Sequence, residues 1–457
     1  MIRSVPAKRA YVETYGCQMN ISDGELMEGL LAARGYEIVR TPEEADVVLV
    51  NTCAIREHAE TRVLGRVSQL NGLKRERPEL VIGVTGCMAQ RLGTTLLEQA
   101  PYVDLVMGPD GYRSLPESLE RIAEGRAARV GREGSRLAVL EFDAAENYQG
   151  LEQLRSDGPV AWVPIQRGCD HRCTFCIVPY VRGPEKNRSA AEVVSEVERL
   201  AERGVSEVTL LGQTVNSYRS EGVSFPELLR RVSRVAGIRR VRFTSPHPND
   251  VTPELVGVMA EEPAVCEHLH LPAQSGSDRT LKRMLRRYTV ADLVEKVDMV
   301  RRAVPDVALS TDIIVAFPGE TDAEFRETLD LMRAVRFDEA YTYKYSVREG
   351  TPAARMPTSD FVEPAVAQSR LEELIEVSRG IQAEINASEV GRVEEVLVEK
   401  RGRHAGQVLG RTRRNKAVAF DADPGRIGSY THVELLHTTG ATFGGIEVST
   451  ATAATTA

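Results

Sequence analysis

The first part of the chain alternates short apolar runs with segments of helical periodicity. Ser22, followed three residues later by Glu25, predicts the capped start of a helix whose leucines recur every three or four positions. Such alternation of strands and helices is typical of a parallel sheet covered by helices. We therefore predict an α/β parallel-sheet domain over residues 8–124, with strands at Ala10–Thr14, Asp46–Val50 and Leu80–Val84.

The middle of the chain repeats this alternation at a longer period. Residues 125–159 lose the periodicity and predict a linker with one short strand at Arg136–Phe142. Residues 160–385 predict a partial barrel of six β–α units, whose active site would lie at the carboxyl ends of the strands. The expected strands are Ala161–Gln166, Glu207–Leu211, Val241–Thr244, His268–Leu271, Ala308–Ile314 and Ala340–Tyr345. The expected helices are Ala190–Arg203, Pro226–Val235, Pro253–Ala260, Val290–Val304, Asp322–Val335 and, at the end, Val362–Ile385.

The last part of the chain changes character, because short β-branched runs are separated by Gly, Arg and Asn. We predict a small all-β barrel over residues 386–448, with strands at Val393–Val398, Ala417–Ala419 and Tyr430–Leu436. The Ala/Thr-rich residues 449–457 are predicted to form a disordered tail. Residues 400–416 contain seven basic side chains and no acidic one.

Composition places the protein in the ordinary globular class. Its 457 residues are 42% hydrophobic and 27% charged, which excludes disorder over most of the length. The net charge of −8 argues only weakly against nucleic-acid binding, since it averages over domains and can conceal a basic face. No apolar run approaches the ~18 residues of a membrane span, and residues 1–10 hold no apolar signal core. We therefore expect a cytoplasmic protein that contacts no membrane.

The cysteines point to metal chemistry, because seven are too few for a disulfide scaffold. Cys169, Cys173 and Cys176 form a C-x3-C-x2-C run just beyond a predicted strand. Three thiolates on one loop can bind three irons of a four-iron cluster and leave the fourth iron open. A closed zinc site needs a fourth ligand, and the nearby His171 lies inside the loop, so zinc is the weaker alternative.

Three further cysteines each follow a predicted strand of the first domain. They are Cys17, Cys53 and Cys87, separated by 36 and 34 positions. The carboxyl ends of parallel strands share one edge of the sheet, where ligands ordinarily bind, so we expect the three thiols to converge. Three isolated buried thiols are the alternative reading. We favour a second cluster with one open iron.

The seventh cysteine and two histidines are weaker candidates for a functional site. Cys266 has no partner cysteine and is expected to pack in the interior. His268 and His270 face the same way on a predicted strand, where we favour a wall or packing role over a metal pair. The sequence contains no Ser-His-Asp order, no phosphate-cradling loop and no dinucleotide-binding fingerprint that would indicate another kind of active site. We therefore expect no classical acid–base catalytic residue.

The cysteine loop, placed after the first barrel strand, resembles that of the radical S-adenosylmethionine superfamily. In that superfamily the open iron chelates S-adenosylmethionine, and one-electron reduction releases a 5′-deoxyadenosyl radical. Gly212 and Gln213 stand where the superfamily usually carries a Gly-Gly-Glu contact to the methionine amino group. The resemblance implies S-adenosylmethionine contacts from Phe175, Gly212 and Gln213. A plain glycine turn with a helix-entry glutamine is the alternative.

Longer runs resemble the methylthiotransferase family from about Ala10 to Ile446. They are YGCQMN (15–20), NTCAIR (51–56), GCMAQR (86–91), GCDHRCTFCIVPYVRG (168–183), LGQTVNSY (211–218) and LHLPAQSGS (269–277). Thr214 and Ala273 depart from the family pattern, and neither is a ligand position. The resemblance implies a radical S-adenosylmethionine barrel at the centre of the chain and a TRAM domain, the family's RNA-binding module, at its C-terminal end.

The resemblance also implies the cofactors and the reaction. Cys169, Cys173 and Cys176 would hold a [4Fe-4S] cluster that coordinates S-adenosylmethionine. An auxiliary [4Fe-4S] cluster would be held by Cys17, Cys53 and Cys87. Two molecules of S-adenosylmethionine per turnover would supply, respectively, a methyl group to sulfur at the auxiliary cluster and the radical that takes hydrogen from C2 of the adenine. The expected substrate is N6-isopentenyladenosine-37 of tRNA, and an external one-electron reductant and a sulfur donor are required.

The prediction of RNA contacts is based on the positive charge of the basic run. Arg411, Arg413, Arg414 and Lys416 are the candidate RNA-binding residues, since cations contact phosphates, which position a nucleic acid without specifying its sequence. A solvated loop face is the alternative. A basic track toward the cysteine loop is expected from Arg182, Lys186, Arg188, Lys282, Arg283, Arg286 and Arg287.

Other functions stay open at this point. Related methylthiotransferases act on threonylcarbamoyladenosine-37 of tRNA or on an aspartate of a ribosomal protein; residues 179–183 and 213–216 favour a tRNA substrate over the ribosomal protein. A non-catalytic iron–sulfur RNA-binding protein belongs to another class, and the presence of all six ligand cysteines weighs against it.

Overall fold

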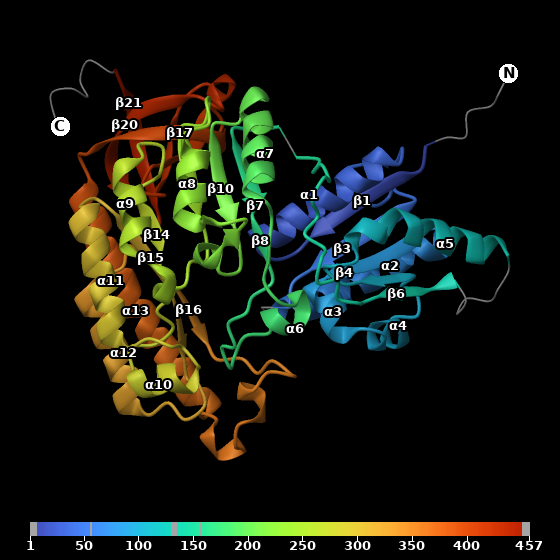
Figure 1. The fold of residues 1–457 in the computed structure, drawn as a ribbon, viewed down its shortest axis with the longest axis horizontal. Coiled ribbons are helices and arrows are strands. Elements are labelled where there is room, and N and C mark those ends of the chain that lie inside the picture. Colours follow the sequence, from blue (N-terminus) through green and yellow to red (C-terminus); the bar gives the residue numbers. More distant parts are fainter. Residues whose placement is uncertain (1–6, 55–56, 129–134, 156, 450–457) are drawn as a thin grey trace. The chain divides into compact units, whose positions relative to one another are not determined.

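A computed structural model describes residues 7–54, 57–128, 135–155 and 157–449 (Figure 1). The chain forms two compact units, each described here by itself. The first unit comprises residues 1–156, 166–171 and 176–188, and the second comprises residues 157–165, 172–175 and 189–457. The chain therefore passes between the units several times around the C-x3-C-x2-C run.

The first unit is built on a six-stranded parallel sheet with the order β2-β1-β3-β4-β5-β6. The strands are β1 (Arg9–Thr14), β2 (Glu37–Ile38), β3 (Val47–Thr52), β4 (Val81–Gly86), β5 (Leu105–Met107) and β6 (Leu137–Val139). The helices are α1 (Gln18–Ala33), α2 (Glu57–Glu76), α3 (Cys87–Leu92), α4 (Thr95–Gln99), α5 (Leu115–Ala127) and, after the cysteine loop, α6 (Val178–Arg182). A short antiparallel pair joins β8 (Gln166–Arg167) to β9 (Lys186–Asn187). The α/β parallel-sheet prediction is confirmed.

Alternate residues of the central strands pack on opposite faces of this sheet. Val48 and Val50 of β3 lie in a core with α2, α3 and α4, whereas Val47 and Leu49 lie in a core with α1 and α5. Every residue of β3 and β4 is buried as a result. Strands covered on both faces are continuously apolar, which is why both were recognisable in the sequence.

The predicted helix start at Ser22 is wrong. Helix α1 begins at Gln18, with Cys17 as its N-cap residue, and Ser22 is buried inside the helix. The Ser22 hydroxyl accepts a hydrogen bond from the Gln153 side chain at 3.2 Å. The local pattern predicted that this hydroxyl would cap the helix, but it bonds to Gln153, a residue from a distant segment of the chain.

The second unit contains the predicted partial barrel. Two parallel sheets, β7-β10-β13 and β14-β15-β16, are joined by a parallel bridge between Val241 and Val265. The strands are β7 (Val160–Pro164), β10 (Glu207–Leu211), β13 (Arg240–Phe243), β14 (His268–His270), β15 (Ala308–Val315) and β16 (Glu339–Lys344). The helices are α7 (Ala190–Glu202), α8 (Phe225–Ser233), α9 (Pro253–Glu261), α10 (Asp278–Arg283), α11 (Val290–Ala303), α12 (Asp322–Val335) and α13 (Pro364–Glu389). A two-stranded hairpin of β11 (Arg219–Ser220) and β12 (Val223–Ser224) precedes α8.

Capping explains why most of these helices begin where they do. A serine or threonine side chain accepts a backbone N–H at the start of α7, α8, α9, α11 and α12. Thr289 with Asp292 and Thr321 with Glu324 form complete capping boxes.

The barrel strands divide their side chains between two faces. Val208 and Leu210 of β10, and Leu309 and Ile313 of β15, pack in the core shared with the helices. The alternate residues of each strand therefore point to the opposite, concave face. On that face lie Glu207, Thr209, His268, His270, Ser310 and Asp312.

The C-terminal part of the second unit is a closed five-stranded barrel with the order β17-β18-β19-β21-β20. The strands are β17 (Val393–Arg401), β18 (Gln407–Thr412), β19 (Ala417–Asp421), β20 (Tyr430–Thr438) and β21 (Thr442–Val448). The small all-β barrel is confirmed, although β18 and β21 were not predicted. Residues 450–457 of the predicted disordered tail lie outside the described residues. Within the described ranges, no helix has the length and apolarity needed to cross a membrane.

Candidate metal and cofactor sites

The first-unit cysteines lie at the carboxyl ends of three neighbouring strands. Cys17 follows β1, Cys53 follows β3, and Cys87 follows β4 as the first residue of α3. Gly16 has a φ of +136°, and a Cβ at this position would lie 2.7 Å from the Cβ of Cys53. Only glycine therefore allows the loop that carries Cys17 to approach Cys53 so closely.

Interactions link the three thiols, and their assignment to one metal centre stays a prediction. A hydrogen bond with Cys53 and the nearby charge of Arg182 lower the pKa of Cys17 to about 6, against the effect of burial. Burial raises the pKa of Cys87, while the charge of Arg182 acts in the opposite direction. Since the thiolate is the form that binds metals, Cys17 is prepared for ligation.

A buried cation stands beside these thiols. The Nε of Arg182 donates to the Sγ of Cys87 at 3.2 Å, and its Nη2 donates to Asp23 at 2.7 Å. Asp23 also accepts from Arg167 at 2.6 Å. Both arginines lower the pKa of Asp23, although its complete burial opposes this. The carboxylate is therefore ionised and fixes the guanidinium of Arg182 in place.

This arrangement fits an iron–sulfur cluster. The Nη1 of Arg182 is buried and has no hydrogen-bond partner among the described residues. An orphaned buried donor is unusual in a protein interior. A cluster held by the three thiols would bring acceptor sulfurs and negative charge to the side of Arg182, and hydrogen bonds to such sulfurs tune its reduction potential.

The predicted basic track is wrong for most of its members. Arg182 is occupied as described, and Lys186 is buried in an ion pair with Asp110 at 2.6 Å. In the second unit, Arg283 pairs with Asp360 at 2.6 Å, and Arg286 is buried. The buried members of the track are Arg182, Lys186, Arg188 and Arg286, whereas Arg283 is partly exposed and Lys282 and Arg287 are exposed.

The C-x3-C-x2-C run is divided between the two units. Cys169 and Cys176 belong to the first unit, where the backbone N–H of Cys169 donates to Gly183 at 3.2 Å. Cys173 belongs to the second unit, where the Nη1 of Arg286 lies 3.6 Å from its Sγ. Cys169 and Cys173 are buried, and Cys176 is partly buried.

The residues expected to contact S-adenosylmethionine lie in the second unit. Gly212 and Gln213 directly follow β10, at the carboxyl end of the strand. The Oε1 of Gln213 is buried without a hydrogen-bond partner among the described residues. Phe175 packs edge-on against Phe317, with 6.5 Å between ring centroids. An unused buried acceptor favours the cofactor contact over the plain-turn reading of Gln213.

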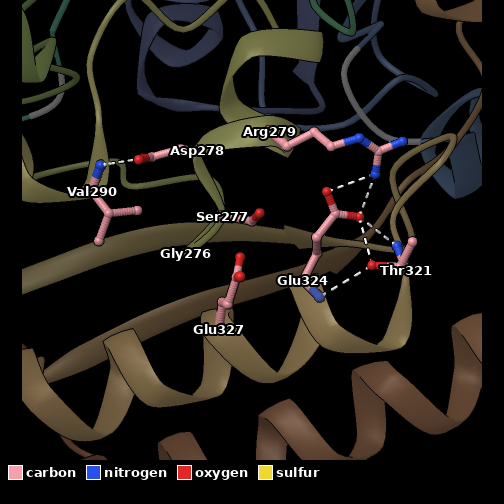
Figure 2. Close-up of a pocket in the computed structure, with 8 residues that line it drawn as sticks. All are labelled: Gly276, Ser277, Asp278, Arg279, Val290, Thr321, Glu324 and Glu327. Carbon is pink, nitrogen blue, oxygen red and sulfur yellow. Dashed lines mark hydrogen bonds and ion pairs between the residues drawn. The ribbon is translucent and has the colours of Figure 1, made fainter.

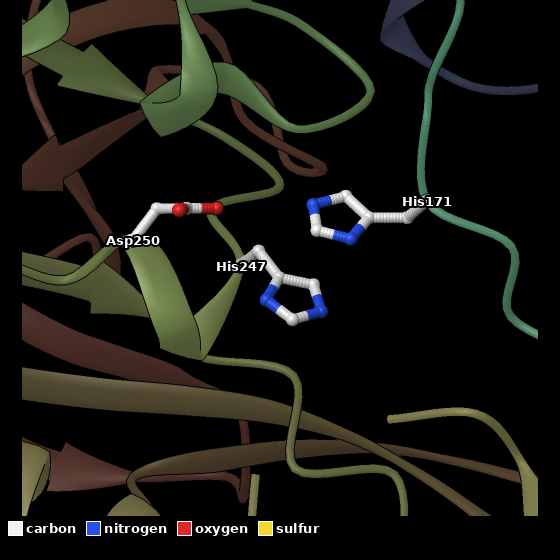
Figure 3. Close-up of side chains that lie close together, drawn as sticks. All are labelled: His171, His247 and Asp250. Atoms are coloured by element: carbon white, nitrogen blue, oxygen red, sulfur yellow. The ribbon is translucent and has the colours of Figure 1, made fainter. Parts of the chain in front are cut away.

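The remaining candidates are a cavity in the second unit and three further polar side chains. A cavity of about 460 Å³ lies beside the start of α12, where Arg279 pairs with Glu324 at 2.8 Å (Figure 2). It contains none of the predicted site residues. Figure 3 draws His171, which belongs to the first unit, and His247 and Asp250, which belong to the second, and no shared site is inferred across the two units. The His247 ring accepts a hydrogen bond from the backbone of Asn249 at 3.2 Å.

Three of the four candidate RNA-binding residues have acidic partners in the second unit. Arg413 pairs with Glu267 at 2.7 Å. Arg414 bridges Glu389 and Glu394, and Lys416 pairs with Asp338. Arg411 differs: its ion pair with Glu399 is long at 3.6 Å, its Nη1 donates to the backbone and side-chain oxygens of Asn415, and its side chain is 42% exposed.

The same segment fastens the small barrel to the strands of the larger one. Arg240 and Arg242 of β13 donate to the backbone carbonyls of Arg411, Thr412 and Arg413, each at 2.8 Å. Arg242 also pairs with Glu207 at 2.8 Å. The turn between β18 and β19 is thus held at the amino-terminal ends of the barrel strands. RNA binding by Arg413, Arg414 and Lys416 stays a prediction, but the structure gives them this packing role.

Sequence reasoning missed Asp23 and the role of Arg182. Asp23 lies in the middle of α1, where an acidic residue gives no sign of being buried. Arg182 stood in a recognised run, but its partners Cys87 and Asp23 lie 95 and 159 positions away. Cys266 is buried, in agreement with the packing role expected for it.

Comparison with known proteins agrees with this architecture. Residues 9–108 match the uncharacterized protein family UPF0004, residues 163–332 the radical SAM superfamily, and residues 387–440 the TRAM domain. Among solved structures, the radical S-adenosylmethionine methyltransferase TsrM from Kitasatospora setae has a TM-score of 0.57 at 16% identity, over 76% of this chain and 77% of that one. The cobalamin-dependent radical enzyme OxsB has a TM-score of 0.54 at 13% identity, over 82% of this chain and 58% of that one. These likenesses support the fold.

The sequence relatives are much closer. A tRNA-2-methylthio-N(6)-dimethylallyladenosine synthase of Thermoanaerobacter sp. is 44% identical over 94% of this chain and 90% of its own. The synthase of the same name from Chloroherpeton thalassium is 42% identical over 95% of both chains. Identity at this level over nearly the whole length shows that the chain belongs to the family of tRNA-2-methylthio-N(6)-dimethylallyladenosine synthases.

Proposed function

We propose that the protein adds a methylthio group to C2 of N6-isopentenyladenosine-37 in tRNA, giving 2-methylthio-N6-dimethylallyladenosine. The relatives carry the name of this activity, and the chain has a radical SAM domain and a TRAM domain. The observation that carries the proposal is that Cys17 interacts with Cys53, while Arg182 donates to Cys87 and keeps an orphaned buried donor among the described residues.

The proposal assigns the six cysteines to two [4Fe-4S] clusters. Cys169, Cys173 and Cys176 would hold the S-adenosylmethionine-coordinating cluster, and Cys17, Cys53 and Cys87 the auxiliary one. With these groups and two molecules of S-adenosylmethionine bound, the site would supply a methyl group, a sulfur atom and a 5′-deoxyadenosyl radical. The C2–H bond of adenine has no useful acidity, which is why no acid–base residue is assigned.

The protein's own residues bind and orient these groups. Arg182 would donate from Nη1 to the auxiliary cluster, and Asp23 holds the guanidinium in position. Arg286 stands beside Cys173 and would offset the negative charge of the other cluster. The Oε1 of Gln213 would accept a hydrogen bond from the ammonium group of S-adenosylmethionine.

The proposal includes the partners of the reaction. The TRAM barrel would contribute to tRNA binding, an external reductant would supply one electron, and a sulfur donor would restore the auxiliary site after turnover. Since the substrate is tRNA, we place the reaction in the cytoplasm.

The test is nucleoside mass spectrometry of tRNA. Cells that lack the gene should lose 2-methylthio-N6-isopentenyladenosine and accumulate N6-isopentenyladenosine, and the gene in trans should restore the product. Loss of a methylthiolated threonylcarbamoyladenosine, or of a methylthiolated ribosomal-protein aspartate, would assign the protein to another branch. A non-catalytic RNA-binding protein would form no 5′-deoxyadenosine from S-adenosylmethionine when reconstituted and reduced without oxygen.

A further inference from the structure

Two exposed tyrosines lie on the concave face of the partial barrel. Along β16, Ala340 packs against the helical core, and the Nζ of Lys344 donates to Gln368 of α13 at 3.2 Å. The alternate residues Tyr341 and Tyr343 therefore face the other side of the strand. Their exposed fractions are 42% and 39%, which is high for aromatic side chains inside a barrel.

Polar groups stand next to this aromatic pair. Asp312 of β15 is the register partner of Tyr341. The Nε2 of His270 lies 3.3 Å from the Oδ2 of Asp312, and its Nδ1 lies 3.0 Å from the Oγ of Ser310. The rings of His270 and Tyr341 meet edge-on at 5.9 Å between centroids. Asp312 keeps its second carboxylate oxygen available and is 30% exposed.

A cation completes the group. Arg411 of β18 lines one cavity with Ser310 and Glu339, which are close along their strands to Asp312 and Tyr341. Unlike Arg413 and Arg414, it has no short ion pair, and its nearest carboxylate, on Glu399, is 3.6 Å away. This partly exposed cation, near the end of β18, therefore lies on the Tyr341 side of the polar group.

These features match an unpaired nucleotide. Aromatic side chains stack on bases of any sequence, a carboxylate accepts the N–H groups of a base edge, and an arginine contacts phosphate. A protein partner would bury the tyrosines against apolar side chains and would leave Asp312 and Arg411 unmatched. A free sugar or amino acid has no extended planar group that would stack on two successive aromatic rings.

We propose that Tyr341 and Tyr343, with Asp312 and Arg411 at their edges, form the platform that receives the extruded adenosine of the RNA substrate. The inference rests on the proposed function and adds the residues that read the base. On the concave face, the strands β14–β16 would hold the base, and the end of β10, with Gly212 and Gln213, would hold S-adenosylmethionine.

The test compares two RNAs on the reconstituted full chain at one salt concentration. One is an anticodon stem-loop with N6-isopentenyladenosine at position 37, and the other is the same RNA with an abasic site there. The unaltered protein should bind the first RNA about tenfold or more tighter, as expected for base–aromatic stacking. In the Tyr341→Ala/Tyr343→Ala variant this preference should fall to within about twofold.

Four further variants separate the loss of stacking from damage to the strand. Tyr341→Phe/Tyr343→Phe should keep the preference, because the ring does the stacking. Thr342→Ala, on the opposite face of the same strand, should behave as the unaltered protein. Arg411→Ala should weaken binding of both RNAs by the same factor, since a phosphate contact does not distinguish them. Asp312→Asn should reduce the preference without abolishing it.

The outcomes separate this inference from the proposed function. If the alanine pair keeps the preference, or if the unaltered protein shows none, the platform is wrong while methylthiolation of tRNA can still hold. If the unaltered protein binds neither RNA, or if cells without the gene keep their methylthiolated nucleoside, the proposed function fails and the platform fails with it.

Discussion

Arg182 donates a hydrogen bond to the Sγ of Cys87 across 3.2 Å, although the two residues are 95 positions apart. Arg182 ends the short helix that follows the C-x3-C-x2-C run, whereas Cys87 belongs to the sheet domain at the start of the chain. The segment that carries three of the proposed cluster ligands therefore also supplies a buried cation to the other three. Correct formation of α6 is a condition for a complete auxiliary site.

We predict that Arg182→Met makes the auxiliary cluster harder to reduce. A buried cation stabilises the reduced, more negative cluster, so its removal should shift the midpoint potential by ~50–100 mV to more negative values. The measurement is a redox titration followed by electron paramagnetic resonance, in a variant whose second-site cysteines 169, 173 and 176 are alanine. Only one cluster then contributes to the signal.

Two matched variants control this experiment. Arg182→Lys keeps the charge and should recover most of the potential. Lys74→Met removes another buried cation of the first unit, which lies on α2 and pairs with Asp104 just before β5, at the opposite ends of the strands from the cysteines. It should leave the potential unchanged. An unaltered potential in Arg182→Met would show that this guanidinium has no role at the cluster.

We predict that the two sets of cysteines fail in different ways. Cys173→Ala should abolish formation of 5′-deoxyadenosine, because the S-adenosylmethionine-coordinating cluster loses a ligand. Cys53→Ala should leave this cleavage largely intact and stop methylthiolation. Both products are measured by mass spectrometry of the same reaction, and Cys266→Ala is the control that should keep both. Near-normal methylthiolation by the Cys53 variant would refute the division of labour.

The sequence predicted those parts of the fold that carry their own local signals. Helix α12 has the bounds predicted for it from its helical pattern, and the structure shows a capping box of Thr321 and Glu324 at its start. Strands β18 and β21 were missed, because glycines and charged residues interrupt their apolar pattern and closure of the barrel supplies their pairing. The same capping pattern failed at Ser22, where a side chain from 131 positions away takes the hydroxyl.

Part of the candidate site could be predicted for a topological reason. Cysteines that follow β1, β3 and β4 come to one edge of the sheet because these strands are parallel neighbours; the sequence indicated the parallel sheet, and the structure supplies the order of its strands. The charges could not be assigned in this way. Arg413, Arg414 and Lys416 looked like a free basic run, because Glu267, Glu389 and Asp338 that neutralise them come from distant segments.

We predict that Gln213 contributes to cofactor affinity. Its buried Oε1 has no partner among the described residues, so an ammonium group placed there would gain a hydrogen bond without displacing another. Gln213→Ala should weaken S-adenosylmethionine binding about five- to tenfold, as expected for a bond of ~1–1.5 kcal/mol. Equilibrium dialysis with the reconstituted protein measures the affinity. Gln368→Ala, an exposed amide on α13, is the control, and equal affinities in the two variants would favour the plain-turn reading.

We predict that Arg414 stabilises the second unit instead of binding RNA. Its guanidinium joins Glu389 and Glu394, and the Glu389 side chain is only 3% exposed. Removing one partner of such a pair leaves a buried charge behind and costs about 3 kcal/mol. Arg414→Ala should therefore lower the melting temperature by roughly 5–10 °C.

Arg411→Ala and the exposed Arg403→Ala serve as controls, and both should leave the melting temperature nearly unchanged. Arg411→Ala should still weaken tRNA binding, because its head group is exposed. Replacing Arg411, Arg413 and Arg414 together would mix loss of a phosphate contact with loosening of the small barrel, so single variants are required. If Arg414→Ala weakened tRNA binding with no change in melting temperature, the packing role would be wrong and the basic run would belong to the RNA.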